Sequence, residues 1–219
     1  FDTGQLAVSG TPAAVADGVM SGTGYYVTIS TGGGAVAFRA GLGRQLFGGR
    51  FRKVILLMRL ELLLRLRQIL PQPGDPTLHE DYVRDARRYV ELAEAVNGPI
   101  PRPVDYSWPW GDALRVIEEA APDLWLVNLE TSITRSDDYE SGKAVHYRMN
   151  PENVPCLTAA HIDICTLANN HMLDFGVAGL EDTLDVLADA GLATVGAGRR
   201  HADALRPSTV ESRSADVTV

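Results

Sequence analysis

The chain has 219 residues, and 45% of them are hydrophobic, so it is long enough for one domain, or part of a larger one, with a sizeable core. Its net charge of −8 excludes nucleic acid as a favoured partner, because an acidic surface repels the phosphate backbone. The two cysteines, Cys156 and Cys165, are too few for a disulfide scaffold and lie in no CxxC motif, so we interpret both as core thiols.

Charge is distributed unevenly along the chain. Residues 1–38 contain no lysine or arginine, residues 39–67 contain eight basic residues and one acidic residue, and residues 68–219 contain 12 basic and 25 acidic residues. A step of this size predicts a boundary near Gln68. We therefore expect residues 1–67 to be an atypical Gly-rich and then basic segment, disordered or foreign to the rest, and residues 68–219 to form one domain or part of a larger one.

Two hydrophobic stretches stand out in the first third. Residues 24–30, GYYVTIS, are aromatic and β-branched, which predicts a strand. Residues 54–70, VILLMRLELLLRLRQIL, carry too many charges for a membrane span, and we interpret them as a buried helix whose arginines reach the surface. The alternative is a basic amphipathic helix, so membrane contact is expected only through residues 51–70. No signal peptide is visible, which favours a cytoplasmic or membrane-peripheral protein.

From residue 70 onward, loops, helices and strands alternate. Prolines predict loops at residues 70–76 and 98–111, and we expect the aromatic side chains of the second loop to pack on the core. Apolar side chains at helical spacing predict helices at residues 78–96, 112–121, 150–160 and 176–191. Short apolar runs predict strands at residues 124–129, 162–168, 192–198 and 214–219. The alternation predicts an α/β fold with a largely parallel sheet.

Polar side chains follow two of these strands. Asn128 and Glu130 lie at the end of the first, and Asn169, Asn170 and His171 come directly after the second. The carboxyl ends of parallel strands meet at one edge of a sheet. We therefore expect these groups to converge if the two strands are neighbours.

The chemistry of this set fits either a metal centre or a simple turn. Carboxylate, amide and imidazole groups suit Mn, Fe, Zn or Mg, and not a soft thiolate metal. Asp174, three residues after His171, could orient that histidine by accepting a hydrogen bond. Asparagines are also common in turns, and Asp174 could instead cap the next helix. Spacing alone leaves both interpretations open.

Three stretches have the character of family motifs. They are VNLETSIT, NPENVPCLTAAHIDICTLANNHMLDFGVAGLEDTLDVLADAGL and VGAGR. These stretches resemble the CapA family, which is named for poly-γ-glutamate capsule synthesis, and the resemblance spans residues 69–199. The family is similar to the calcineurin-like metallophosphoesterases, in which two sheets form a sandwich flanked by helices. The resemblance therefore implies a partial metallophosphoesterase-like sandwich.

The resemblance also implies roles for the residues at the strand ends. In the related enzymes a Gly-Asn-His segment supplies a metal-binding asparagine and a catalytic histidine, which correspond here to Asn170 and His171. Glu130 takes the place of an upstream acidic metal ligand, and Asp174 joins His171 as a catalytic residue. The implied cofactor is one or two divalent ions of Mn, Fe, Zn or Mg.

Substrate binding is expected from Asn128 and from Arg148, the latter as a donor to phosphate or carboxylate. The metal-ligand set is nevertheless incomplete. Family members usually open with a strand that ends in GDVM, whose aspartate binds the metal, and Met58 and Arg59 stand where its glycine and aspartate are expected. An arginine repels a metal ion. The later histidine-bearing strands of the family are expected beyond Val219.

The resemblance thus implies a metal-dependent phosphoesterase-type hydrolase of capsule or poly-γ-glutamate biosynthesis. Its substrate would be an anionic polymer or a phosphorylated small molecule, and a capsule synthase would be a partner. The alternatives are a non-catalytic component that binds the polymer or the synthase, and an inactive truncated relative. A membrane-surface scaffold is a further alternative that rests only on residues 51–70.

Overall fold

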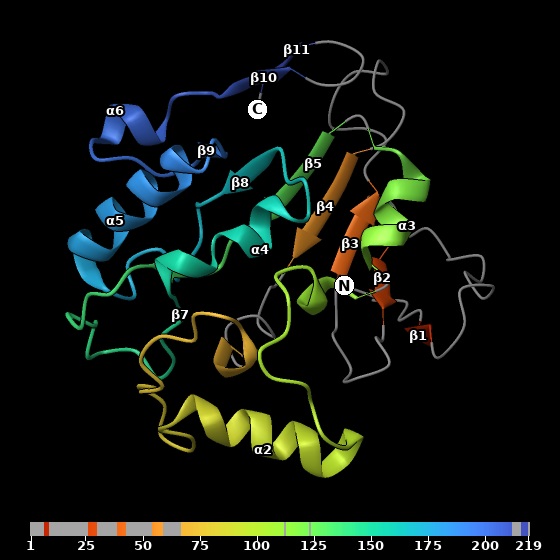
Figure 1. The fold of residues 1–219 in the computed structure, drawn as a ribbon. Helices are drawn as coiled ribbons and strands as arrows, with labels where there is room; N and C mark the ends of the chain where they lie inside the picture. Colours follow the sequence, from red (N-terminus) through yellow and green to blue (C-terminus); the bar gives the residue numbers. More distant parts are fainter. Residues whose placement is uncertain are drawn as a thin grey trace.

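The computed structural model of the chain describes residues 7–8, 26–29, 39–42, 54–58, 67–111, 113–122, 124–211 and 216–218. Its largest element is a seven-stranded sheet (Figure 1). In spatial order the strands are β1 (Ala7–Val8), β2 (Tyr26–Ile29), β3 (Arg39–Leu42), β4 (Val54–Met58), β5 (Leu124–Asn128), β8 (Ile164–Thr166) and β9 (Ala193–Val195). The strands expected within residues 24–30, 124–129, 162–168 and 192–198 are confirmed.

Strands β4, β5, β8 and β9 run parallel, so their carboxyl ends share one edge. Met58 pairs with Asn128, and Asn128 pairs with Thr166, which places these positions side by side. β5 lies inside this group, and its first four residues are buried. The α/β fold with a largely parallel sheet and flanking helices is confirmed, although β2, β3 and β4 pair antiparallel.

The helix expected over residues 54–70 is wrong where the structure describes that stretch. Val54–Met58 form β4, and Arg67–Ile69 form a short 3-10 helix, η1. A continuous apolar run suits an inner strand of a parallel sheet as well as it suits a buried helix, so periodicity does not separate the two. Residues 59–66 lie outside the described residues. Within the described ranges, no helix is long and apolar enough to cross a membrane.

Three longer helices confirm expected ones: α2 (Ala86–Asn97), α3 (Ala113–Ala120) and α5 (Gly176–Asp189). α3 and α5 lie within their expected ranges, and α2 ends one residue beyond its range. α2 begins later than the expected residue 78, because Asp85 caps it by accepting a hydrogen bond from the Arg87 amide at 2.9 Å. The prolines of residues 70–76 lie in a loop, as expected.

The helix expected over residues 150–160 is divided in two. Pro151–Asn153 form the 3-10 helix η3, and Pro155–Thr158 form the α-helix α4. Pro155 has no N–H group to continue the first turn, so a new helix starts at this proline. Asn150 precedes the first turn, as expected, but its side chain makes no capping bond there.

Several short elements were not expected. A small second sheet joins β6 (Ser132–Ile133) to β7 (Arg148–Met149) in parallel, and η2 (Trp108–Trp110) and α6 (His201–Ala204) are single turns. β10 (Thr209–Glu211) pairs antiparallel with β11 (Asp216–Thr218), which lies in the strand expected at 214–219. These unexpected elements are two to four residues long, which is too short for a periodicity that sequence analysis could detect.

Helix α5 packs closely on β6 and thereby fixes the region next to the end of β8. The Ile133 amide donates to Thr183 Oγ1 at 2.8 Å. A Cβ on Gly179 would lie 2.7 Å from the Cβ of Phe175, the residue that precedes α5, so the first turn of the helix requires glycine here. Ser132 Oγ donates to the His171 carbonyl at 3.2 Å, which ties β6 to the loop after β8.

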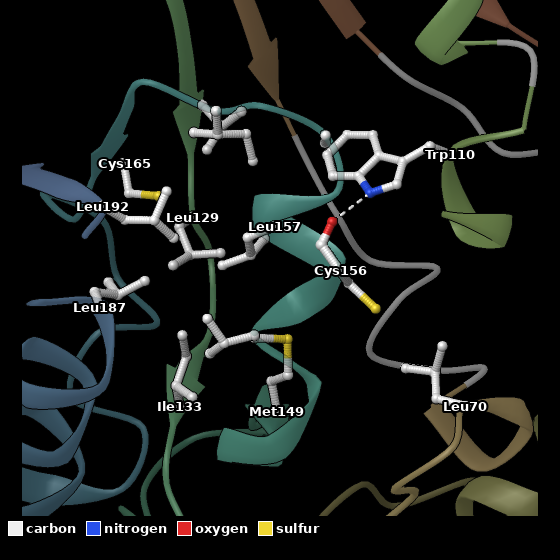
Figure 2. Packing of buried hydrophobic residues seen from close by; sticks show 14 of the residues in the cluster. Leu70, Trp110, Leu129, Ile133, Met149, Cys156, Leu157, Cys165, Leu187 and Leu192 are labelled. Carbon is white, nitrogen blue, oxygen red and sulfur yellow. Dashed lines mark hydrogen bonds between the residues drawn. The ribbon is translucent and has the colours of Figure 1, made fainter. Parts of the chain in front are cut away.

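The aromatic loop at residues 98–111 packs on the core, as expected (Figure 2). Trp110 is fully buried, its Nε1 donates to the Cys156 carbonyl at 2.7 Å, and its ring meets Trp125 edge-on at 5.5 Å. Cys156 and Cys165 are buried and free, and burial raises the pKa of each thiol to about 12. The interpretation of both cysteines as core thiols is confirmed.

Candidate functional site

Polar side chains gather where β5 and β8 end, and we call this group the strand-end cluster: Asn128, Glu130, Asn169, Asn170, His171 and Asp174. Asn128 Nδ2 donates to Glu130 Oε1 at 2.8 Å. Asn169 Nδ2 donates to Asn128 Oδ1 at 3.1 Å and to the Leu129 carbonyl at 3.0 Å. One asparagine therefore links the loop after β8 to the end of β5, because the two strands are neighbours.

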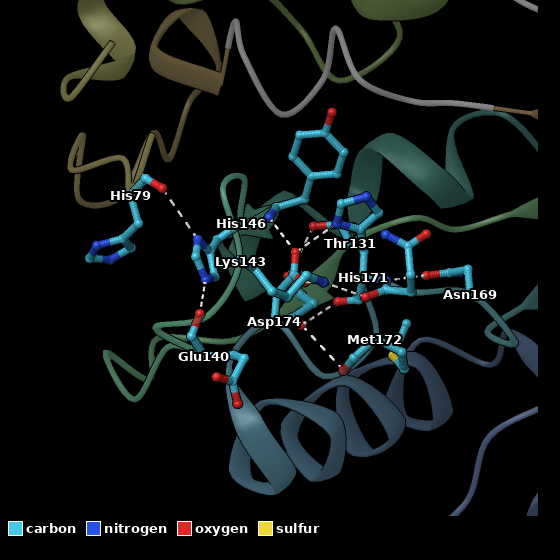
Figure 3. Close-up of polar contacts among 12 residues, drawn as sticks. His79, Thr131, Glu140, Lys143, His146, Asn169, His171, Met172 and Asp174 are labelled. Carbon is cyan, nitrogen blue, oxygen red and sulfur yellow. Dashed lines mark hydrogen bonds and ion pairs between the residues drawn. The ribbon is translucent and has the colours of Figure 1, made fainter. Parts of the chain in front are cut away.

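His171 lies in the loop between β8 and α5, as Figure 3 shows. Asn169 Oδ1 accepts a hydrogen bond from the His171 amide at 3.0 Å, which makes the tight turn that positions the imidazole. The ring stacks on Tyr147 with 4.2 Å between the ring centroids, and Nδ1 lies 2.8 Å from Asp174 Oδ2. The histidine side chain is 13% exposed, so solvent reaches it while its orientation is fixed.

Asp174 is buried and orients His171 (Figure 3). Its Oδ2 also accepts a hydrogen bond from the Tyr147 amide at 2.6 Å, and its Oδ1 pairs with Lys143 Nζ. Burial by itself would raise the pKa of Asp174, but the hydrogen bonds from His171, Lys143 and Tyr147 outweigh it and hold the pKa below its usual range. Helix α5 has no side-chain cap, so the alternative that Asp174 caps this helix is wrong.

Lys143 and Tyr147 complete this arrangement, and sequence analysis did not single them out. Lys143 Nζ contacts both the Asn170 carbonyl and Asp174 Oδ1. Both residues come from the segment before β7, about 30 residues earlier in the chain than the loop they contact. No local sequence pattern predicts such a contact. Side chains alternate along extended backbone, so Tyr147, directly before β7, and Arg148, its first residue, point to opposite sides.

Asn170 and Arg148 lie at the margin of this group or outside it. The Asn170 side chain is exposed, and its carbonyl accepts from Lys143. Arg148 contacts the Ser136 carbonyl, Asp137 and the face of Phe175, and these residues are not in the strand-end cluster. The structure thus joins Asn128 and Glu130 to the loop that carries Asn169, Asn170, His171 and Asp174. Arg148 makes its contacts elsewhere.

Comparison with known proteins supplies the family. The model of the bacterial capsule synthesis protein PGA_cap matches residues 69–219. The chain belongs to this family. The CapA resemblance is confirmed with it, since proteins named CapA are among the relatives.

The PGA_cap relatives cover different shares of the chain. A probable polyglutamine synthesis accessory protein of Mycobacterium tuberculosis is 57% identical over 152 residues, which are 69% of this chain and 38% of that protein. The PGA biosynthesis protein CapA of Bacillus subtilis is 36% identical over 85 residues, 38% of this chain and 22% of that protein. The capsule biosynthesis protein CapA of Bacillus anthracis is 36% identical over 64 residues, 29% of this chain and 16% of that protein. The chain therefore spans well under half of these relatives.

The described residues of this PGA_cap chain do not complete a metal site. Among them, no group of three or more His, Cys, Asp or Glu side chains is placed to hold an ion. The strand-end cluster contributes Glu130 as a half-buried carboxylate and Asn170 as an exposed amide, whereas Asp174 already holds three donors. Glu130 and Asn170 as metal ligands therefore stay a prediction from the sequence resemblance.

Proposed function

We propose that this chain carries part of the active site of a metal-dependent, phosphoesterase-type hydrolase that acts in capsule or poly-γ-glutamate biosynthesis. The observation that supports this proposal is the oriented histidine, because Asp174 holds His171 at the edge where parallel strands end. The substrate would be a phosphate ester or acyl phosphate, and the partners would be the anionic polymer and its synthase.

The arrangement suits His171 as a general acid. Asp174 is anionic at neutral pH, so it keeps the shared proton on His171 Nδ1 and leaves Nε2 to exchange a proton with substrate. Lys143 and the Tyr147 amide prevent the carboxylate from turning away. His171 would then donate the proton that the leaving oxygen requires when its bond to phosphorus breaks.

A divalent metal, when bound, would polarise a phosphoryl oxygen. Glu130 and Asn170 are the described residues that would contribute to holding it. Asn128 and Asn169 would orient Glu130 through the hydrogen bonds that join them.

Hydrolysis of acetyl phosphate and p-nitrophenyl phosphate with added Mn²⁺, Zn²⁺ or Mg²⁺ tests the proposal. We expect His171→Ala to lower turnover by about 10²-fold, as loss of a general acid does. The free energy of unfolding should fall by only about 1 kcal/mol, because the residue lies in a loop and is partly exposed.

His201→Ala is the matched control, since His201 is exposed on α6 and outside the strand-end cluster. It should leave turnover unchanged. A His171→Ala variant that keeps its activity but melts far below wild type would show that His171 is structural. Binding of the polymer without metal uptake or turnover would instead support the non-catalytic alternative.

A further inference from the structure

A cavity lies apart from the strand-end cluster, because none of the described residues that line it belongs to that cluster. Its volume is about 450 Å³, which lies within the range of small-ligand sites. The loop after η1, the ends of β6 and β7, and the first turn of η3 surround it. We call it the Arg148 pocket. The charged residues of its lining are Arg67, Asp75, Arg135, Asp137, Arg148 and Glu152.

Arg148 has a hydrogen-bond donor that the described protein does not satisfy. Its side chain is only 8% exposed. Nη1 donates to the Ser136 carbonyl at 2.8 Å and to Asp137 Oδ1 at 2.7 Å, and the guanidinium lies over Phe175 with 5.0 Å to the ring centroid. Nη2 is buried and has no hydrogen-bond partner among the described residues. Asp75 Oδ2 lies 3.7 Å from it, which is an ion-pair distance but too long for a hydrogen bond.

A buried, charged donor without an acceptor is unfavourable, and an oxygen from a ligand would relieve it. A second arginine, Arg67, lines the same cavity. It is buried, with its guanidinium donating to the carbonyls of Asp75 and Thr77 at 2.9 and 3.1 Å. Burial and the positive charge of Arg148 lower the pKa of Arg67 to about 10, against the opposite effect of Asp75, Glu80 and Asp85.

The acidic residues of the lining do not remove the need for an anion at this point. Asp137 is paired with Arg148 Nη1, and Glu152 is paired with Arg135 at the mouth of the pocket. Asp75 has an exposed side chain and directs Oδ1 to the Thr77 amide and hydroxyl. The lining therefore carries as many acidic as basic side chains, while the Nη2 group of Arg148 has no acceptor among the described residues.

We propose that the Arg148 pocket binds the oxyanion of a carboxylate or phosphate group, with Arg148 Nη2 as the principal donor. Arginine N–H groups form short, strong hydrogen bonds to either anion. Asp75 is the competing charge that such a ligand must overcome. The inference is independent of hydrolysis at His171, because it concerns binding at a separate set of residues.

Isothermal titration calorimetry of the full chain at low ionic strength tests the inference, since salt screens exposed charges. The probes are inorganic phosphate, glutarate and a γ-linked glutamate trimer. We expect a dissociation constant on the order of 1 mM for at least one of them, as suits a single anionic group. Arg148→Gln should weaken binding at least about tenfold, because a charge-assisted bond is lost.

Asp75→Asn should strengthen binding by about fivefold, because it removes a negative charge near the site. The amide oxygen can still accept from Thr77, so the turn is kept. Arg88→Gln is the control of equal charge change: Arg88 is 58% exposed on α2, pairs with Glu91, and should leave binding unchanged.

Circular dichroism shows whether the Arg148→Gln variant folds. If it does not fold, the binding affinity of the Asp75→Asn variant decides the test. Tighter binding by Asp75→Asn supports the inference, and unchanged or weaker binding overturns it. The inference is also overturned if no probe binds saturably, or if a folded Arg148→Gln binds as wild type does. Binding of phosphate alone identifies a phosphate ligand, and preference for the glutamate trimer over glutarate identifies a polymer carboxylate. His171→Ala should bind as wild type does, which separates this test from that of the proposed hydrolase.

Discussion

At the scale of single residues, Asp174 is the side chain on which the contacts around His171 converge. It is buried and accepts hydrogen bonds from His171, the Tyr147 amide and Lys143. Asparagine at this position would lack the charge opposite Lys143 and would turn an N–H₂ group toward at least one donor. We expect Asp174→Asn to lower the free energy of unfolding by about 3 kcal/mol, because the remaining charge is left uncompensated. Urea denaturation at pH 7 measures the change.

Asp185→Asn is the control for this prediction. Asp185 also forms an ion pair, with Arg199, but both side chains are exposed. Its replacement should change stability by less than about 1 kcal/mol, as is usual for surface pairs. Equal losses in the two variants would contradict a special role for the buried carboxylate.

The same prediction has a pH dependence. The folded pKa of Asp174 lies below its usual range. The ionised carboxylate therefore stabilises the fold fully above the unfolded pKa of about 3.9, and this contribution is lost as the pH falls through the folded value. The difference in stability between wild type and Asp174→Asn should be largest near neutral pH and shrink below about pH 4. A difference that stays constant down to pH 3 would count against this account.

At the scale of elements, the first turn of α5 depends on Gly179. A Cβ there would come within 2.7 Å of the Cβ of Phe175, which precedes the helix, and within 3.4 Å of Thr134 Cγ2, which follows β6. Gly179→Ala should therefore displace Phe175 from its buried position at the start of α5 and cost about 1–3 kcal/mol, as overpacking does. Thermal denaturation followed by circular dichroism measures this loss.

Gly142→Ala provides the comparison, because a Cβ at Gly142 would meet only the flexible tip of Glu140, at 3.3 Å. Its melting temperature should stay close to that of wild type. If Gly179→Ala melted equally close to wild type, the first turn of α5 would accommodate a Cβ beside Phe175 without strain, and this account would be wrong.

Which elements could be predicted follows from their length and periodicity. The helices α3 and α5 lie within their expected ranges, because long patterns average out local ambiguity. The strands β5, β8 and β9 are short, but they lie within longer runs of mostly apolar residues that predict strands. β4 was taken for a helix, since five apolar residues have no period of their own. The division at Pro155 shows how a single missing N–H overrides an otherwise helical stretch.

At the scale of the whole molecule, β4 covers the edge of β5. Deleting residues 1–58 would remove β4 and leave a row of unpaired backbone groups on an apolar strand. We expect the shortened chain to aggregate or to unfold at lower urea concentration than the full chain, as judged by size-exclusion chromatography and denaturation.

Deletion of residues 1–24 is the control, because it leaves β2, β3 and β4 in place. It should have a much smaller effect. If the chain without residues 1–58 stayed monomeric and equally stable, these residues would not contribute to the fold, which would favour the boundary predicted near Gln68.

The strand-end cluster shows how far sequence analysis of a site can reach. The rule that parallel strands end at one edge was sufficient to expect that Asn128, Glu130 and the loop after β8 would meet. Lys143 and Tyr147 were not accessible in this way, because their place depends on how the segment before β7 folds back. The direction of Arg148 was inaccessible for the same reason.

The sequence separations between Asp174 and its donors also indicate the order in which these contacts form during folding. His171 is three residues away, so this contact can form within a single turn, whereas Lys143 and Tyr147 lie 31 and 27 residues earlier. Closing those loops costs chain entropy that is recovered only when the segment before β7 docks. A nascent or partly folded chain therefore has the histidine without the restraints that hold it. We therefore expect His171 to become oriented only after the segment before β7 has docked, and the proton transfer proposed for it would wait for that step.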